Sequence, residues 1–305
     1  MLWLTWRQYR PQALVTGALL AVLGVVLLVN GVSADDYSTG TPCLGLGGEC
    51  GGAGTVTSGR FDSMYPFVSS LILVPAVVGV FWGAPLLAKE FERGTHKLMW
   101  TQSVSRRHWL TVKLGVVGLV VALGGLVFGV IIEAWLRTFP GKSRPLDDFA
   151  LFSLVGVVPL AWWLFAFVLG AAAGAVVRKT LPAIGITIAV SAAVLVGLVL
   201  LRPHYVAPQR VELTGDVPAL QSVAASRYIL VAPDGREYDP LRGPAECPPG
   251  PEQGKCLDAA GYRNFVEFQP LDRFWRFQWT EAGILFAGTL LLGAVAVQGG
   301  VRRRV

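Results

Sequence analysis

Residues 86–115 read LLAKEFERGTHKLMWTQSVSRRHWLTVKLG, and this polar segment stands between two long apolar runs. Hydrophobic residues make up 53% of the chain and charged residues 15%, with a mean hydropathy of +0.54. These values exceed those of an ordinary soluble domain. The composition therefore predicts an integral membrane protein in which the quoted segment joins two membrane-spanning helices.

Apolar runs near or above the roughly 17–25 residues needed to cross a hydrocarbon core occur six times. An all-α integral membrane protein with six transmembrane helices is therefore predicted. Pro75 and Pro159 are predicted helix kinks, because proline removes a backbone hydrogen bond; each is also compatible with a packing role only. The six runs lie at about residues 13–32, 67–87, 114–136, 151–177, 181–201 and 282–300.

The first residues combine aromatic and basic side chains. Trp3, Trp6 and Tyr9 alternate with Arg7 and Arg10, which suits an N-terminal interfacial helix over residues 1–12. A frayed basic terminus that supplies only topology signals is an equal alternative. Residues 13–201 are then expected to form a five-span transmembrane region.

Basic residues predict the orientation, because Lys and Arg are retained on the cytoplasmic side. With both termini cytoplasmic, the inner segments hold thirteen Lys or Arg and only two acidic residues. Residues 282–305 then form the sixth helix with a basic cytoplasmic tail, and residues 88–113 form the largest inner segment. Because the basic residues are dispersed at span ends, no nucleic acid partner is expected.

The same orientation places residues 202–281 outside, as a small extracytoplasmic cap of mixed or irregular structure. Segments 210–213 and 227–231 alternate as strands do. All four cysteines fall in outer loops, where disulfides form, and we predict Cys43–Cys50 and Cys247–Cys256. Zinc binding is less expected, because neither pair has CxxC spacing or a neighbouring histidine.

Signatures of catalysis are missing from the sequence. There is no HExxH or GxSxG motif, and the three histidines are too scattered for a metal site. The apolar cores also lack the ionisable residues that coupled carriers use near the bilayer midplane. No catalytic or metal site is therefore expected, and energy for any transport has to come from another subunit.

The inner segment has the features of a docking surface. Gly94 favours the end of a helix, and Ser105 suits the N-cap of the next one. Between them, Leu98–Trp100 are expected to form an apolar turn flanked by charged residues. Such a turn fits docking onto a soluble partner. It equally fits an amphipathic turn at the lipid interface, and the residues alone leave both readings open.

The runs Gly83–Thr95 and Trp100–Arg106, with Trp109, Leu110 and Lys113, resemble permease subunits of type-2 ABC exporters, most closely their actinobacterial branch. The family pattern has two acidic residues, Gly-Thr, a short apolar turn, a Ser-Arg pair and a lysine at the next span. The resemblance implies ATPase-coupling roles for Glu90, Glu92, Arg93, Gly94, Thr95, Leu98, Met99, Trp100, Ser105, Arg106 and Lys113.

The resemblance further implies a type V ABC exporter-like half-transporter in the plasma membrane. It would pair with a second permease copy or a related permease, and with two copies of a cytoplasmic ABC-type ATPase that binds ATP and Mg. This chain would carry no cofactor, and the exported substrate would be hydrophobic or amphipathic, such as a drug, peptide or lipid-like molecule. The alternative is a membrane-embedded immunity or sensor component whose cap binds a peptide or antibiotic.

Overall fold

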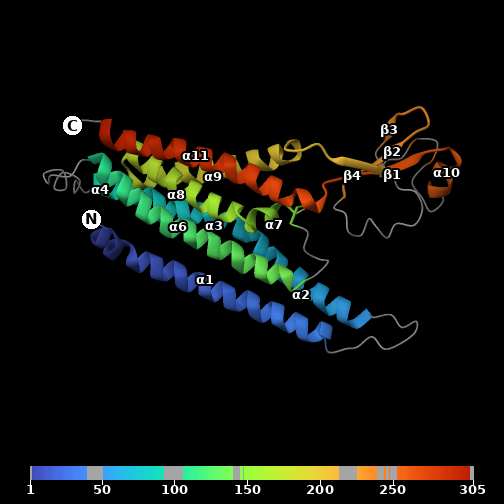
Figure 1. Cartoon of the computed structure of the whole chain (residues 1–305), viewed down its shortest axis with the longest axis horizontal. Coiled ribbons are helices and arrows are strands. Elements are labelled where there is room, and N and C mark those ends of the chain that lie inside the picture. Colours follow the sequence, from blue (N-terminus) through green and yellow to red (C-terminus); the bar gives the residue numbers. More distant parts are fainter. Residues whose placement is uncertain are drawn as a thin grey trace.

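The computed structural model describes residues 2–39, 51–92, 106–139, 145–146, 148–212, 225–238, 244, 247 and 253–302. Its long helices form one elongated bundle, and a small sheet extends from one end (Figure 1). We call this the sheet end. The other end, at which α4 (Ala84–Glu92) stops and α6 (Arg106–Arg137) begins, is called the loop end. Both chain termini lie at the loop end (Figure 1).

Within the described ranges, six helical segments are long and apolar enough to cross a membrane, as predicted. The first, third and fifth are carried by α1 (Leu2–Thr39), α6 and α9 (Thr180–Leu201). The sixth begins in a short 3-10 turn (Leu271–Arg273) and continues as α11 (Phe274–Arg302). The six spans are Tyr9–Val32, Gly59–Glu90, Arg107–Arg137, Val158–Val177, Thr180–His204 and Leu271–Gly299.

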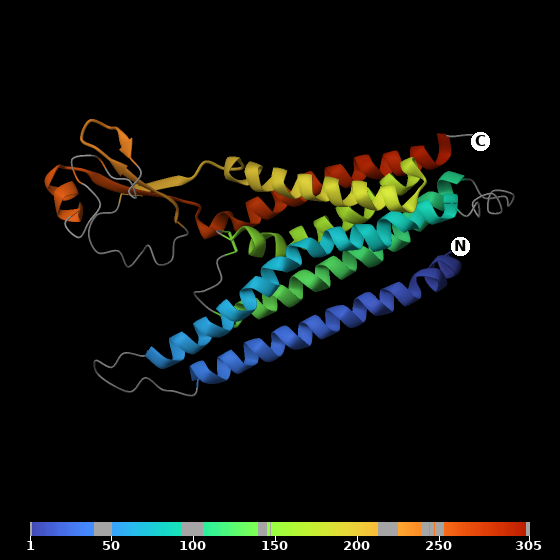
Figure 2. The same ribbon diagram turned by 180° about the vertical axis from the view of Figure 1, so that it is seen from behind.

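The fourth span, α8 (Val158–Val177), is the centre of the bundle, and 78% of it is buried. It packs against α11, α6, α9 and the second span. Its run of Gly and Ala between Gly170 and Ala175 lets neighbouring backbones approach closely. By contrast, α1 packs against α6 and α2 (Gly51–Ser70), on the side of the bundle away from α9 and α11 (Figure 1, Figure 2).

The second span is irregular. After α2 come a 3-10 turn (Leu71–Leu73), α3 (Val74–Val78), a π-helical turn (Gly79–Gly83) and then α4. Pro75 lies in the first turn of α3, where a missing N–H is tolerated. This irregularity is located where Pro75 predicts a kink.

The fourth span differs from the prediction that Pro159 bends a continuous helix. The predicted run 151–177 is divided between α7 (Phe149–Leu154) and α8, and the break comes before the proline. Gly156 has a φ of +69°, a left-handed conformation that glycine adopts without steric cost. Pro159 occupies the first turn of α8, and proline is favoured there because its fixed φ suits a helix start.

The N-terminal segment also differs from expectation. Residues 2–12 do not form a separate interfacial helix; they are the first turns of α1, which continues without interruption through Pro11 to Thr39. The Leu, Arg and Gln residues of this segment are good helix formers, and the first glycine is Gly17. Pro11 disfavours a helix interior, but α1 continues through it.

Residues after α9 form an antiparallel sheet with the strand order β1-β4-β2-β3. The strands are β1 (Gln209–Glu212), β2 (Ala225–Val231), β3 (Glu237–Tyr238) and β4 (Arg263–Phe268), and α10 (Gln253–Ala259) precedes β4. The predicted strand segments 210–213 and 227–231 overlap β1 and β2, and residue 213 lies outside the described residues. Cys247 and Cys256 form a disulfide with a Cα–Cα distance of 5.8 Å, whereas the predicted Cys43–Cys50 pair lies outside the described residues.

Candidate functional site

The C-terminal end of α4 is tied to α6 by a buried ion pair between Glu90 and Lys113. The Lys113 Nζ also donates to the Leu86 carbonyl oxygen at 3.4 Å. It lies 5.1 Å from the ring centroid of Trp109 and 5.6 Å from that of Tyr9 on α1. A buried ammonium needs such partners, because its desolvation is costly. Lys113 therefore joins three helices at the loop end.

A second carboxylate ties α4 to α9. Glu92 Oε1 accepts a hydrogen bond from the Thr180 backbone N–H at 2.8 Å, and Oε2 accepts one from the Thr180 hydroxyl at 2.7 Å. The first N–H groups of a helix lack partners within the helix, and its positive end favours an anion. The local N-cap residue, Lys179, offers no capping side chain. Glu92 supplies the cap from a different helix.

We call Glu90, Glu92, Lys113 and Thr180 the loop-end anchor. Three of them were predicted from the sequence as ATPase-coupling residues, and the structure brings them to the ends of neighbouring helices. Sequence reasoning missed Thr180, although the tight inner turn before it and the absence of an Asp or Asn cap were available signals. Arg106 is the first residue of α6; the other predicted coupling residues, Arg93, Gly94, Thr95, Leu98, Met99, Trp100 and Ser105, lie outside the described residues.

A second buried polar cluster lies at the sheet end. Arg202, directly after α9, forms an ion pair of 2.9 Å with Glu281 on α11. Its guanidinium also donates to the Ser153 hydroxyl at 3.1 Å and lies 4.1 Å from the Phe152 ring centroid. Glu281 is fully buried. This cluster therefore binds α9, α7 and α11 together where the chain leaves the bundle for the sheet.

Gln278 provides hydrogen-bond partners for backbone groups at the break between α7 and α8. Its side-chain Oε1 accepts from the backbone N–H groups of Val157 and Val158, both at 3.1 Å, and its Nε2 donates to the Phe152 carbonyl at 3.0 Å. Backbone groups freed by a broken helix must find partners when water is excluded. A side chain at Gly156 would clash, because its Cβ would lie 2.7 Å from Gln278 Oε1.

The sheet-end cluster was not predicted from the sequence. Arg202 and Glu281 fall one residue outside the predicted fifth and sixth runs, so they were placed in the outer loop. The available signal was the opposite charge of two residues that border apolar runs at the same predicted membrane face. Their separation of 79 positions in the chain hides this pairing from any local pattern.

Five apolar spans around a sixth, buried central helix, with these charged pairs toward the bundle ends, define a multi-pass membrane protein. A sequence profile described as "ABC-2 membrane transporter related" matches residues 17–202. The chain belongs to this family and is therefore a transmembrane component of an ABC transporter. Comparison with curated proteins and with solved structures gave no match.

Proposed function

We propose that the chain is the permease subunit of an ATP-driven exporter. A separately encoded cytoplasmic ATPase, in two copies, would bind ATP and Mg²⁺ and hydrolyse ATP, while two permeases move a hydrophobic or amphipathic substrate outward. The second permease is another copy of this chain or a related one. Family membership supports the general class.

The orientation that this function needs has the loop end in the cytoplasm and the sheet outside the plasma membrane. Both termini would then be cytoplasmic. The excess of Lys and Arg in the segments assigned to the inside supports this. The Cys247–Cys256 disulfide at the sheet end supports it independently, because disulfides persist in oxidising compartments.

The loop-end anchor is the observation that carries the proposal. Glu90 and Glu92 stand directly before residues 93–105 and connect the end of α4 to α6 and α9. A force applied to residues 93–105 is therefore delivered to three helices together. This is the mechanical arrangement that coupling to an external ATPase requires.

The docking surface for the ATPase is proposed to be the apolar turn Leu98–Trp100. A few buried apolar side chains usually supply most of the affinity of such an interface, and exposed ion pairs add at most about 1 kcal/mol. In this arrangement Leu98, Met99 and Trp100 hold the ATPase, while the anchor transmits its movement.

Replacing Leu98, Met99 and Trp100 together by alanine is expected to reduce ATPase binding at least about 100-fold, because truncating one hot-spot side chain costs about 2 kcal/mol or more. The measurement is affinity purification of the tagged chain from native membranes, with the partners identified by mass spectrometry. The triple variant should reach the membrane in normal amounts and recover no ABC-type ATPase.

The matched control replaces Leu271, Trp275 and Trp279 by alanine, because these three apolar side chains are 53–60% exposed and lie at the sheet end. This variant should retain the ATPase. Failure of the unmodified chain to recover any ATPase in several mild detergents would contradict the exporter function. The sheet would then be the place to search for a bound peptide or antibiotic.

Changing Glu90 to glutamine tests the anchor itself. The substitution preserves size but leaves Lys113 buried without its counter-charge, so the free energy of unfolding should fall by about 1–3 kcal/mol. In a double-mutant cycle with Lys113→Met, the interaction energy between the two positions should be about 1–3 kcal/mol. Thermal unfolding and substrate-stimulated ATP hydrolysis by the purified complex are the two readouts.

Glu133→Gln is the control for this cycle, because Glu133 pairs with Arg137 in an exposed i, i+4 bridge on the same helix. Its stability effect should stay below about 1 kcal/mol, with unchanged ATP hydrolysis. If Glu90→Gln lowers stability and leaves substrate stimulation intact, the pair only holds the fold and has no part in coupling.

A further inference from the structure

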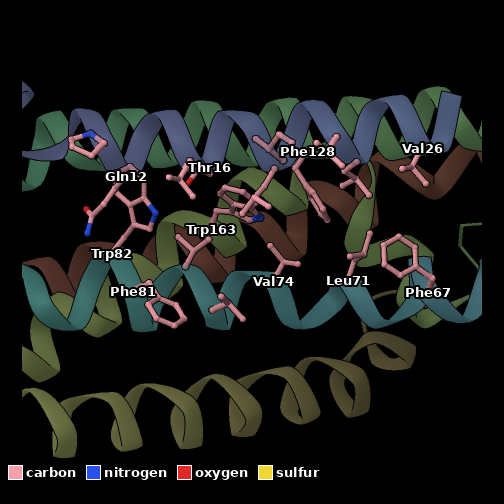
Figure 3. Close-up of a pocket in the computed structure, with 18 residues that line it drawn as sticks. Gln12, Thr16, Val26, Phe67, Leu71, Val74, Phe81, Trp82, Phe128 and Trp163 are labelled. Atoms are coloured by element: carbon pink, nitrogen blue, oxygen red, sulfur yellow. The ribbon is translucent and has the colours of Figure 1, made fainter. Parts of the chain in front are cut away.

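A groove with a volume of about 730 Å³ runs between α1 and the second span. This size is within the range of about 300–1,000 Å³ that is usual for small-molecule sites. One wall is a face of α1 that includes Val15, Leu19 and Val22, and the opposite wall includes Leu71 and Val74. Phe128 and Trp163 lie between these walls, from α6 and α8 (Figure 3).

The groove is bounded by contacts at both ends. At the loop end, Tyr9 stacks on Trp82 of the π-helical turn, with ring centroids 6.5 Å apart. At the sheet end, Asn30 accepts a hydrogen bond of 3.0 Å from the Trp135 indole. These two contacts attach α1 to the bundle on either side of the groove. The position of α1, and with it the groove, is therefore set by the fold.

Polarity is distributed unequally along the groove. Gln12, Thr16 and the Trp82 indole lie toward one end, whereas Val26 and Phe67 lie at the other (Figure 3). The polar end is the loop end, since it adjoins the Tyr9–Trp82 contact. The remainder of the lining is apolar. A molecule that matches this lining has a polar head at the loop end and a long hydrocarbon portion.

The length of the groove indicates a single extended chain. From Gln12 to Val26 the helix advances about 21 Å at 1.5 Å per residue. This is well over half of the roughly 30 Å hydrocarbon core. A volume of about 730 Å³ spread over that length makes the groove elongated. It suits one straight alkyl chain better than a compact multi-ring molecule.

Charge near the polar end favours an anionic head. Arg7 precedes Pro11 by four residues and therefore lies one helical turn before the groove on a neighbouring part of the same face. No acidic residue occurs before Asp35. Arg7 and Arg10 therefore give the first turns of α1 a net positive charge.

We propose that this groove binds a single-chain anionic amphiphile, with its head near Arg7 and its chain along α1. The assignment of this amphiphile as the transported substrate rests on the proposed export function; the binding site does not. The groove thus narrows the substrate class of the exporter from hydrophobic molecules in general to long-chain anionic lipids.

The test uses 9,10-dibromostearate, whose bromine atoms quench tryptophan fluorescence on contact. The purified full chain in detergent should show saturable quenching, and the saturable part should disappear in Trp82→Phe/Trp163→Phe. Filling the groove with Val15→Phe/Val22→Phe should weaken binding at least tenfold. The control Leu14→Phe/Val25→Phe should bind normally, since these four α1 side chains are 61–63% exposed and only Val15 and Val22 line the groove.

A comparison of dibromostearate with its methyl ester tests whether the bound head is anionic. The methyl ester of the same brominated chain should bind about threefold more weakly, as should dibromostearate to Arg7→Gln, because an exposed charge pair adds only modestly to affinity. Equal binding of acid and ester would overturn the anionic head. Stronger disulfide cross-linking between copies carrying Val22→Cys than between copies carrying Val25→Cys would show that a second copy occupies the groove, and would overturn the site.

The outcomes separate the site from the export function. Absence of saturable quenching overturns the groove and leaves the exporter proposal standing. Saturable binding that fails to stimulate ATP hydrolysis in a complex with bound ATPase overturns the substrate assignment. Saturable binding by a chain that recovers no ATPase supports the site and counts against the exporter.

Discussion

Replacement of Gly170 by leucine is expected to prevent the bundle from assembling. A Cβ atom at Gly170 would lie 2.3 Å from the Gly79 carbonyl oxygen and 2.7 Å from the Ala84 backbone nitrogen. A Cβ at Gly83 would lie 2.3 Å from the Phe167 carbonyl oxygen. These neighbours are backbone atoms, which cannot rotate away as a side chain does. The second and fourth spans therefore have to separate if either glycine acquires a side chain.

The expected loss is large because this crossing positions the central helix. Overpacking a core costs about 1–3 kcal/mol and more when backbones must move, so we expect a loss of at least about 3 kcal/mol for Gly170→Leu. Gly79–Gly83 and Gly170–Gly174 both have the small-xxx-small spacing that permits close helix contact. The measurement is the yield of monodisperse protein after detergent extraction, followed by thermal unfolding.

Gly197→Leu is the matched control. Gly197 also lies within a membrane-spanning helix, but a Cβ there would meet no atom within 4 Å. Both substitutions add the same apolar side chain to a span, so any difference reports packing and not hydrophobicity. Gly197→Leu should behave like the unmodified protein. Equal yields for the two variants would show that α8 and the second span are not in close contact.

Replacement of Arg202 by methionine should destabilise the protein by about 3–5 kcal/mol, because it leaves a buried carboxylate without a counter-charge. That carboxylate, Glu281, is fully buried, and Arg202 supplies hydrogen bonds of 2.9 and 3.2 Å to it. Methionine preserves much of the apolar length of the side chain. The loss should be measured as a decrease in the free energy of unfolding in detergent.

The double variant Arg202→Met/Glu281→Met separates two causes of the loss of stability. One is the loss of the ion pair itself, and the other is the burial of Glu281 without a counter-charge. Replacing a buried pair by apolar residues of similar size is often neutral, so the double variant should regain most of the stability. Arg137→Met, in the exposed pair with Glu133, should cost less than about 1 kcal/mol. A double variant no more stable than Arg202→Met would show that the guanidinium acts mainly through Ser153 and Phe152.

The two structural predictions bear on function through the same helices. Gly83 adjoins α4, whose other end carries Glu90 and Glu92, and Gly170 lies on the central helix. Close packing at the glycine crossing therefore holds the second span, including α4, directly against α8. In the proposed exporter, movement at the loop end would be transmitted along α8 toward Gln278 and Arg202 at the sheet end.

Sequence patterns were sufficient to predict features that depend on local composition. The six spans follow from run length, and β1 and β2 from alternation. Glu90, Glu92 and Lys113 were identified through resemblance, and the structure adds Thr180 as the partner of Glu92. Two local predictions needed correction: residues 2–12 belong to α1, and the predicted fourth run breaks at Gly156, before Pro159.

The sequence by itself determined that this is a six-span membrane protein, because an apolar run long enough to cross the hydrocarbon core has few other stable environments. It also carried the family resemblance around residues 83–113. Only the tertiary structure decided which glycines touch, which charges pair and where the groove lies. Arg202 meets Glu281 and Gly170 meets Gly79 from distant parts of the chain, and such contacts depend on helix packing, which periodicity within one segment does not encode.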